Sequence, residues 1–114
     1  MAELWNSDIQ IVDWGCGQGL ATVCLFDFFR QNNMSLDLVK KVILIEPSEK
    51  ALERAGIHVD AYLNDKERET PVNKYLDDVE GDEIKSNHPI TIHLFSNILD
   101  IPSIDLYQLQ HYAD

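Results

Sequence analysis

Apolar and polar positions form blocks along the chain that predict strands separated by helices. Runs of apolar, often β-branched residues predict strands, and apolar residues at helical spacing predict the segments between them. The predicted strands are residues 9–14, 42–46, 57–63 and 90–95. Because short strands alternate with helices of about ten residues, we expect an α/β fold, a three-layer Rossmann-like arrangement of a parallel sheet with helices on both faces.

Three helices are predicted between the four strands. The first covers residues 20–30, and the apolar positions that we expect on its sheet-facing side are Leu20, Val23, Cys24, Leu25 and Phe28. The second begins after Ser48, a suitable N-cap, and ends at Gly56. The third covers residues 71–80, with Thr70 as N-cap and a proline in its first turn. Another helix is predicted to begin near Pro102.

A glycine-rich turn joins the first predicted strand to the first helix. Its residues, DWGCGQG, run from Asp13 to Gly19 and place glycine at every second position from Gly15. Glycine accepts backbone conformations that other residues resist, and it has no Cβ to keep a ligand away from the main chain. The following helix directs unpaired N–H groups and the positive end of its dipole toward the turn. The pattern therefore predicts a ligand-binding turn.

The DWGCGQG segment resembles motif I of the class I S-adenosylmethionine-dependent methyltransferases, an acid followed by GxGxG after the first strand. The resemblance implies that Asp13 orients the methionine part of S-adenosylmethionine and that the turn, Gly15, Cys16, Gly17 and Gly19, lies against this cofactor. The alternative is a dinucleotide-binding turn that would take NAD, whose pattern is GxGxxG or GxGxxA. Counted from Gly15, the sixth position is Leu20, which fits neither form.

A second segment, VILIEPSEKALERA, resembles the second-strand motif of the same methyltransferases. The resemblance implies that Glu46 binds the ribose hydroxyls and that Pro47 packs beside the adenine. A carboxylate at the end of a strand can accept hydrogen bonds from two neighbouring hydroxyls, which supports this role independently. Two alternatives stay open, because Glu46 would serve a dinucleotide enzyme equally well or would merely end the strand.

The ends of the third and fourth predicted strands carry polar residues. The resemblance implies that Asn64, or Asp65 beside it, contacts the adenine amino group; a turn-capping role is the alternative. FSNILDIP resembles a loose form of motif IV in which Asn97 lines the cofactor or acceptor pocket, but it departs from the NPPY form, so no acceptor follows. We expect His93 to be a buried, hydrogen-bonded core residue, and no catalytic base is assigned.

Composition and charge bear on which partners, which compartment and which metal or disulfide chemistry we expect. The chain has 20 acidic and 9 basic residues and a formal net charge of −11, which makes nucleic-acid binding by this chain unfavourable. No segment resembles a signal peptide or a membrane span, so we expect a cytoplasmic protein that does not bind membranes. Two cysteines, Cys16 and Cys24, do not indicate a disulfide framework, and no CxxC pair or histidine cluster predicts a metal site.

The resemblance covers nearly the whole chain but only about four of the seven strands that the family's fold usually has. We therefore expect residues 1–114 to be a partial S-adenosylmethionine-binding domain from a larger protein, with an exposed sheet edge that could form a homodimer. The predicted function is a methyltransferase domain that transfers the methyl group of S-adenosylmethionine to an unknown acceptor. The alternatives are a non-catalytic methyltransferase-like binding module and a nicotinamide-dependent oxidoreductase.

Overall fold

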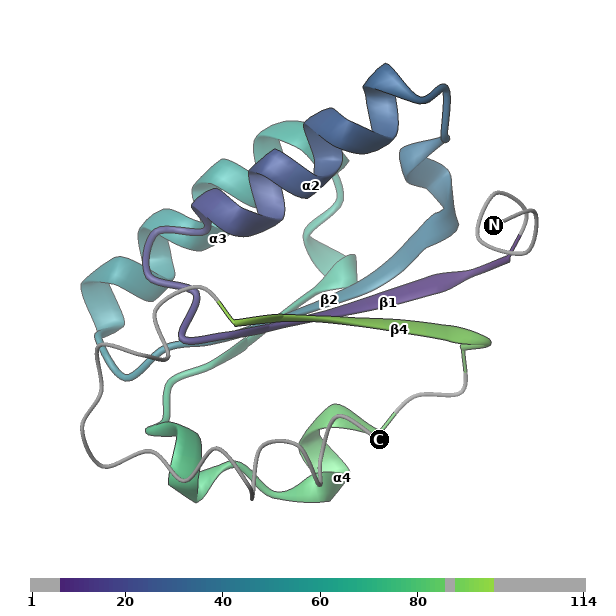
Figure 1. Cartoon of the computed structure of the whole chain (residues 1–114). Helices are drawn as coiled ribbons and strands as arrows, with labels where there is room; N and C mark the ends of the chain where they lie inside the picture. The colour runs from purple at the N-terminus through teal and green to yellow at the C-terminus, as the bar shows by residue number, and fades with distance from the viewer. Residues whose placement is uncertain (1–6, 86–87, 96–114) are drawn as a thin grey trace.

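A parallel four-stranded sheet forms the centre of the computed structural model, which describes residues 7–85 and 88–95 (Figure 1). Its strands are β1 (Ile9–Trp14), β2 (Val39–Ile45), β3 (Glu69–Val72) and β4 (Ile90–Phe95). Their order in the sheet is β3-β2-β1-β4, and all three neighbouring pairs are parallel. The chain therefore builds outward from β1 in both directions, as Rossmann-like sheets do. The predicted α/β class and parallel sheet are confirmed.

Helical segments cover both faces of this sheet (Figure 1). The helices α2 (Leu20–Gln31) and α3 (Glu49–Leu63) lie on one face, and the short helix α4 (Gly81–Ile84) lies on the other. Three short 3-10 segments complete the connections, namely η1 (Leu36–Leu38), η2 (Lys66–Arg68) and η3 (Leu76–Asp78). Each long helix returns the chain to the start of the next parallel strand, so the carboxyl ends of neighbouring strands lie at the same edge of the sheet.

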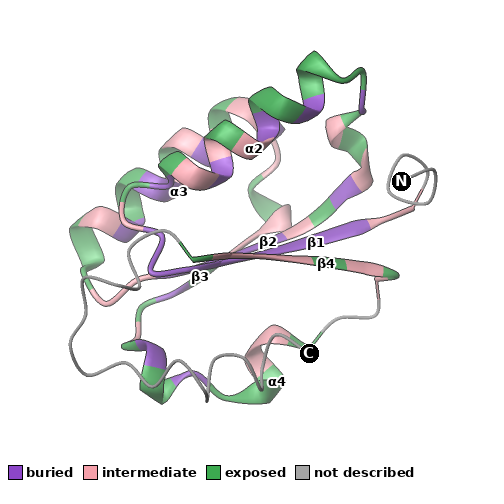
Figure 2. Ribbon diagram, in the orientation of Figure 1, coloured by how far each residue is buried: buried purple, intermediate pink, exposed green. Residues whose placement is uncertain are grey.

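The two faces of the sheet support two separate cores, and β1 contributes to both because all six of its residues are buried (Figure 2). Ile9 and Ile11 pack under α2 and α3, while Val12 and Trp14 point to the opposite core. Parallel strands buried on both faces carry continuous apolar runs rather than alternating ones. This explains why β1 has the predicted bounds and why β2 is found where predicted, starting three residues earlier. β4 also has the predicted bounds, although none of its residues is fully buried.

The buried side of α2 differs from the predicted one. Leu20, Cys24 and Phe28 are exposed, with 67% of Leu20 and 49% of Phe28 accessible to solvent. The residues that are buried instead are Thr22, Phe26 and Phe29. Apolar residues occur on every side of this helix, so helical spacing alone allows more than one buried face. The large aromatic rings, together with a hydrogen bond made by Thr22, decide which face is buried.

The predicted strand at residues 57–63 is wrong, because α3 continues through Gly56 to Leu63. A glycine inside a helix costs about 1 kcal/mol relative to alanine, which is too little to end a helix that packs well. The buried residues of α3 recur every three or four positions, at Leu52, Ala55, Val59 and Leu63. The predicted start of this helix is confirmed, since the hydroxyl of Ser48 accepts a hydrogen bond from the Ala51 amide at 3.3 Å.

The predicted helix at residues 71–80 is also wrong. Thr70 and Pro71 belong to β3, where they pair with Ile43 and Leu44 of β2. A Thr-Pro pair suits a helix start, but proline is equally tolerated in a strand at the edge of a sheet, where its missing N–H faces no neighbour. The acidic segment that follows forms η3 and α4 instead. The helix predicted near Pro102 lies outside the described residues.

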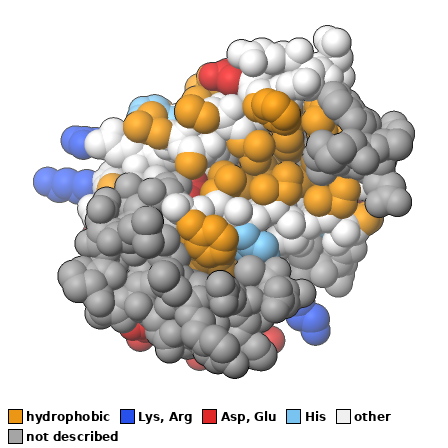
Figure 3. All heavy atoms as spheres, in the orientation of Figure 1, with side chains coloured by type: hydrophobic (Ala, Val, Ile, Leu, Met, Phe, Trp, Pro, Cys, Tyr) orange, Lys and Arg blue, Asp and Glu red, His pale blue; other side chains and the backbone are white. Residues whose placement is uncertain are grey.

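β3 and β4 stand at the two ends of the described sheet. On the face shown in Figure 3, hydrophobic side chains gather near the middle of the molecular surface.

The predicted dimerisation through an exposed edge of the sheet stays a prediction. None of the helices in the described part of the chain has the length and apolar character needed to cross a bilayer.

Candidate functional site

The turn between β1 and α2 has the backbone conformation that its glycines suggest. Gly15, Gly17 and Gly19 have φ angles of 65°, 54° and 86°, all in the left-handed region. An L-residue with a side chain is disfavoured there by about 1–2 kcal/mol, so each glycine is needed for this path of the chain. The turn lies at the carboxyl end of the sheet, which is where open α/β sheets bind their ligands.

Backbone contacts join this turn to its neighbours on both sides. The Cys16 amide donates to the carbonyl of Ile45, the last residue of β2, at 2.9 Å, and the Gly19 amide donates to the Cys16 carbonyl at 2.8 Å. A Cβ built on Gly19 would lie 3.2 Å from Cα and Cβ of Ala55, so this glycine also permits close contact between α2 and α3. The turn is thus shaped by hydrogen bonding and by packing together.

Glu46 connects the end of β2 to the glycine turn. Its Oε1 accepts a hydrogen bond from the Gly17 amide at 2.9 Å, and its Oε2 accepts one from the Ser48 amide at 2.9 Å. The carboxylate therefore bridges the turn and the start of α3. Pro47 follows directly and is partly buried. The ribose and adenine contacts expected of Glu46 and Pro47 stay predictions.

Asp13 lies beneath the turn and is fully buried. Its Oδ2 accepts a hydrogen bond from the Thr22 hydroxyl at 2.7 Å, and this bond links the end of β1 to the first turn of α2. A buried carboxylate needs such partners, because removing an unpaired charge from water is strongly unfavourable. Asp13 therefore supports the turn where β1 leads into α2.

Cys16 forms part of the wall of the turn rather than a reactive group. Its side chain is almost completely buried. Burial, followed by the nearby charges of Asp13 and Glu46, raises the pKa of the Cys16 thiol well above its ordinary value. A thiol held in its protonated form is a poor nucleophile. The contribution of Cys16 is therefore its backbone and its packing.

Two residues at this edge of the sheet were not identified from the sequence. His58 of α3 bonds through Nδ1 to the carbonyl oxygen of Gln18 at 2.7 Å; because a carbonyl only accepts, Nδ1 carries the proton. Asn73, just after β3, donates through Nδ2 to the carbonyls of Glu46 and Pro47 at 3.0 Å each. Both were missed because the third strand was assigned to residues 57–63. The polar residue following the short segment TPV is the signal that would have identified Asn73.

Asn64 is not brought to this site. It caps the C-terminus of α3 with a φ of 53°, and its amide donates to the Asp60 carbonyl at 2.7 Å. Since α3 starts at the carboxyl end of β2 and runs back along the sheet, its C-terminus lies at the opposite end of the strands. The predicted adenine contact depended on the incorrect strand, whereas the alternative capping role agrees with the structure. Asn97 lies outside the described residues.

His93 lies in β4 on the face opposite α2. The Trp14 indole Nε1 donates to His93 Nδ1 at 3.0 Å, and the two rings stack with centroids 6.2 Å apart. Burial lowers the pKa of His93, which favours the neutral ring that can accept this bond. The predicted hydrogen bond is confirmed, although the side chain is only partly buried. Trp14 itself is fully buried and belongs to the core on that face of the sheet.

Comparison with known proteins does not extend this description. No protein-family model matches the chain, and no curated protein is significantly similar to it. The geometry of the turn, Glu46 and Asn73 is therefore the basis for inferring a function.

Proposed function

We propose that this chain is an S-adenosylmethionine-dependent methyltransferase domain that binds the cofactor at the DWGCGQG turn and at Glu46. The observation that carries the proposal is the left-handed conformation of Gly15, Gly17 and Gly19 directly beside a carboxylate at the end of the next strand. The glycines keep side chains off the main chain of the turn, which is partly exposed at Gly17, and the carboxylate supplies an acceptor for two hydroxyl groups.

The contacts around Glu46 are compatible with a nucleoside ligand. Each of its oxygens accepts one backbone N–H, and each carboxylate oxygen has two lone pairs. One acceptor position therefore remains on each oxygen for a ribose hydroxyl. The existing bonds also hold the carboxylate in one orientation, which reduces the ordering that binding would require.

The other residues would contribute by position. The turn and the N-terminus of α2 would lie along the methionine portion, and Asp13 would keep that turn in place through Thr22. Pro47 and Asn73 would border the adenine, with Asn73 fixing the backbone at Glu46 and Pro47. The sulfonium of the cofactor supplies an already activated methyl group, so the protein's task is to align the reactants and exclude water.

A second candidate is a binding module that retains the fold without transferring a methyl group. The observation in its favour is that the polar groups of the turn are bonded to one another, Glu46 to two amides and Asp13 to Thr22. Such a network can stabilise the fold in the absence of any reaction. Methyl transfer from labelled S-adenosylmethionine to a panel of peptide, nucleic-acid and small-molecule acceptors separates the two candidates.

Cofactor binding is tested by titrating the ¹⁵N-labelled chain with S-adenosylhomocysteine and, in a separate arm, with NAD. We expect saturable shifts of the Gly17 and Gly19 amide signals with S-adenosylhomocysteine only. Glu46→Gln should weaken binding at least about tenfold, which corresponds to about 1.4 kcal/mol. Glu67→Gln, which removes the same charge from an exposed position in η2, should bind as the original chain does.

Two outcomes would contradict the proposal. Saturable binding of NAD without binding of S-adenosylhomocysteine would favour a dinucleotide site. Equal binding by the Glu46→Gln and original chains would mean that the ligand lies elsewhere.

A further inference from the structure

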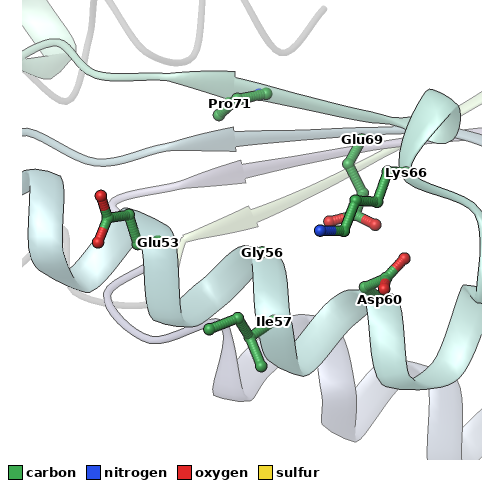
Figure 4. A pocket seen from close by; sticks show the side chains of 7 residues that line it. All are labelled: Glu53, Gly56, Ile57, Asp60, Lys66, Glu69 and Pro71. Atoms are coloured by element: carbon green, nitrogen blue, oxygen red, sulfur yellow. The ribbon is translucent and has the colours of Figure 1, made fainter.

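A cavity lies between α3 and β3, at the outer edge of the sheet. Its volume is about 680 Å³, within the range of small-molecule sites. Seven residues line it, namely Glu53, Gly56, Ile57, Asp60, Lys66, Glu69 and Pro71 (Figure 4). None of them belongs to the glycine turn or contacts Glu46 through a hydrogen bond described above, so the cavity is a separate feature of the fold.

The residues of α3 and β3 that line the cavity explain why it is open. Gly56 has no side chain, and a Cβ built there would lie 3.7 Å from Oε1 of Glu69. The carboxylate of Glu69 therefore approaches the backbone of α3 where a larger residue would meet it. Ile57 turns an apolar side chain outward, with 67% of its surface exposed, and Pro71 provides a second apolar wall. Glycine inside α3 thus makes room beside a strand rather than ending the helix.

Glu69 is incompletely satisfied in this cavity. Its Oε2 is buried and has no hydrogen-bond donor. Figure 4 shows the side chains of Asp60, Lys66 and Glu69 converging at one end of the cavity. Two facing carboxylates are both acceptors, so neither can satisfy the other unless a proton or a cation lies between them. Burial and the proximity of Asp60 raise the pKa of Glu69 to about 7.

The charged groups around Glu69 leave a place for a positive group. Asp65 adds to the negative potential, but its carboxylate is paired with Arg68 at 3.1 Å. Lys66 is exposed and lowers the pKa of Glu69. Within residues 7–85 and 88–95, the ion pairs are Arg68 with Asp65 and Lys74 with Glu83, so Lys66 is not paired with Glu69.

The lining of the cavity indicates the chemistry of a ligand. Three carboxylates and one ammonium give a net charge of −2 when all are ionised. The described His, Cys, Asp and Glu side chains form no group of three or more that could hold a metal ion. Apolar walls next to the carboxylates suit a ligand with a hydrocarbon part. We propose that this cavity binds a small organic cation, a primary amine on a short apolar chain, with its ammonium between Asp60 and Glu69.

The amine would donate to both carboxylates and supply the donor that Oε2 of Glu69 lacks. Charge-assisted bonds of this kind are about twice as strong as neutral ones. Because a proton on Glu69 occupies the same place, proton and ammonium compete. Binding should therefore strengthen as pH rises through 7, the pKa of Glu69. Loss of this pH dependence in Glu69→Gln separates binding at this carboxylate from general attraction of cations to the acidic surface.

The experiment titrates the full ¹⁵N-labelled chain with n-butylammonium chloride, with sodium chloride at equal ionic strength and with n-butanol as controls. We expect saturable shifts at the amides of Gly56, Ile57 and Glu69 with butylammonium alone. The dissociation constant should fall severalfold between about pH 6 and about pH 8. Shifts spread over the acidic surface without saturation, or equal shifts with n-butanol, would overturn the proposal.

Three variants test the assignment, each first shown to be folded by its amide spectrum. Glu69→Gln should weaken binding at least about tenfold and remove its pH dependence. Lys66→Gln should strengthen binding because it removes the competing ammonium. Glu49→Gln, an exposed residue at the other end of α3, should bind as the original chain does. An unchanged affinity in Glu69→Gln, or equal weakening in Glu49→Gln, would refute the site. Because these residues lie outside the turn, failure here leaves the cofactor proposal intact.

Discussion

The glycine turn and the cavity beside β3 each contain a glutamate, but the two carboxylates are satisfied in opposite ways. Glu46 accepts two backbone hydrogen bonds at 2.9 Å, whereas Oε2 of Glu69 is buried without a donor. The first carboxylate is part of a completed hydrogen-bond network. The second remains responsive to protons and cations. The comparison teaches that the same residue type in one fold can either organise a loop or remain available for a charged partner.

The two regions also use glycine differently, and this difference predicts the largest effect. Gly19 has a φ of 86°, and a Cβ would meet Ala55 at 3.2 Å, while Gly56 lies within α3 with 3.7 Å of room. Gly19→Ala should lower the free energy of unfolding by about 2–4 kcal/mol through strain and overpacking. Gly56→Ala should raise it by about 0.5–1 kcal/mol through helix propensity.

Urea denaturation of the two variants measures this contrast directly. Both remove one glycine and add one methyl group, so each serves as the control for the other. If Gly19→Ala were as stable as the original chain, the close contact between α2 and α3 would be absent in solution.

Glu46→Gln sharpens the comparison at the turn. The amide of glutamine retains one acceptor oxygen, so only one of the two backbone bonds to Gly17 and Ser48 can survive unchanged. We expect a loss of about 1–2 kcal/mol in the free energy of unfolding. Amide hydrogen exchange at Gly17 and Ser48 should accelerate. Glu67→Gln is the matched control, and a similar loss there would point to net charge rather than to the bridge.

Glu69→Gln should have a small effect on stability, and the only strongly pH-dependent one among these variants. The pKa of Glu69 is raised to about 7 in the folded chain, so the folded state binds this proton more tightly than the unfolded state. The resulting stabilisation is complete below the unfolded pKa of about 4.3 and is lost as pH rises through 7. Glutamine imitates the protonated acid at every pH.

The variant should therefore gain stability relative to the original chain on going from about pH 5 to about pH 8. After allowance for solvent screening of this partly exposed group, the gain is about 1 kcal/mol. Urea denaturation at both pH values measures it, and Glu67→Gln should show no such change. A stability difference independent of pH would mean that Glu69 ionises in the folded chain as an exposed glutamate does.

Local sequence was sufficient to predict an element where its pattern of apolar and polar residues favoured one kind of structure clearly over the others. β1, α2 and β4 were predicted because each is a distinct apolar block bounded by glycine or polar residues. The glycine turn and Glu46 followed from the same blocks. Local sequence was insufficient from Gly56 to Val72, where a glycine within a helix and a proline within a strand both imitate boundaries. Because of that error, Asn64 was expected at the ligand-binding edge of the sheet, and Asn73 was not identified as a residue of that edge.

The amino-acid sequence by itself determined the alternation of strands and helices, the left-handed turn that needs three glycines, and the acid at the end of β2. Only the tertiary structure decided which side of α2 is buried, where β3 runs, and which carboxylate lacks a donor. The physical reason is the distance along the chain over which each kind of interaction acts. Backbone preferences and apolar periodicity act within a few residues, whereas the pairing of β3 with β2 and the approach of Glu69 to Asp60 depend on contacts that form only when the chain has folded.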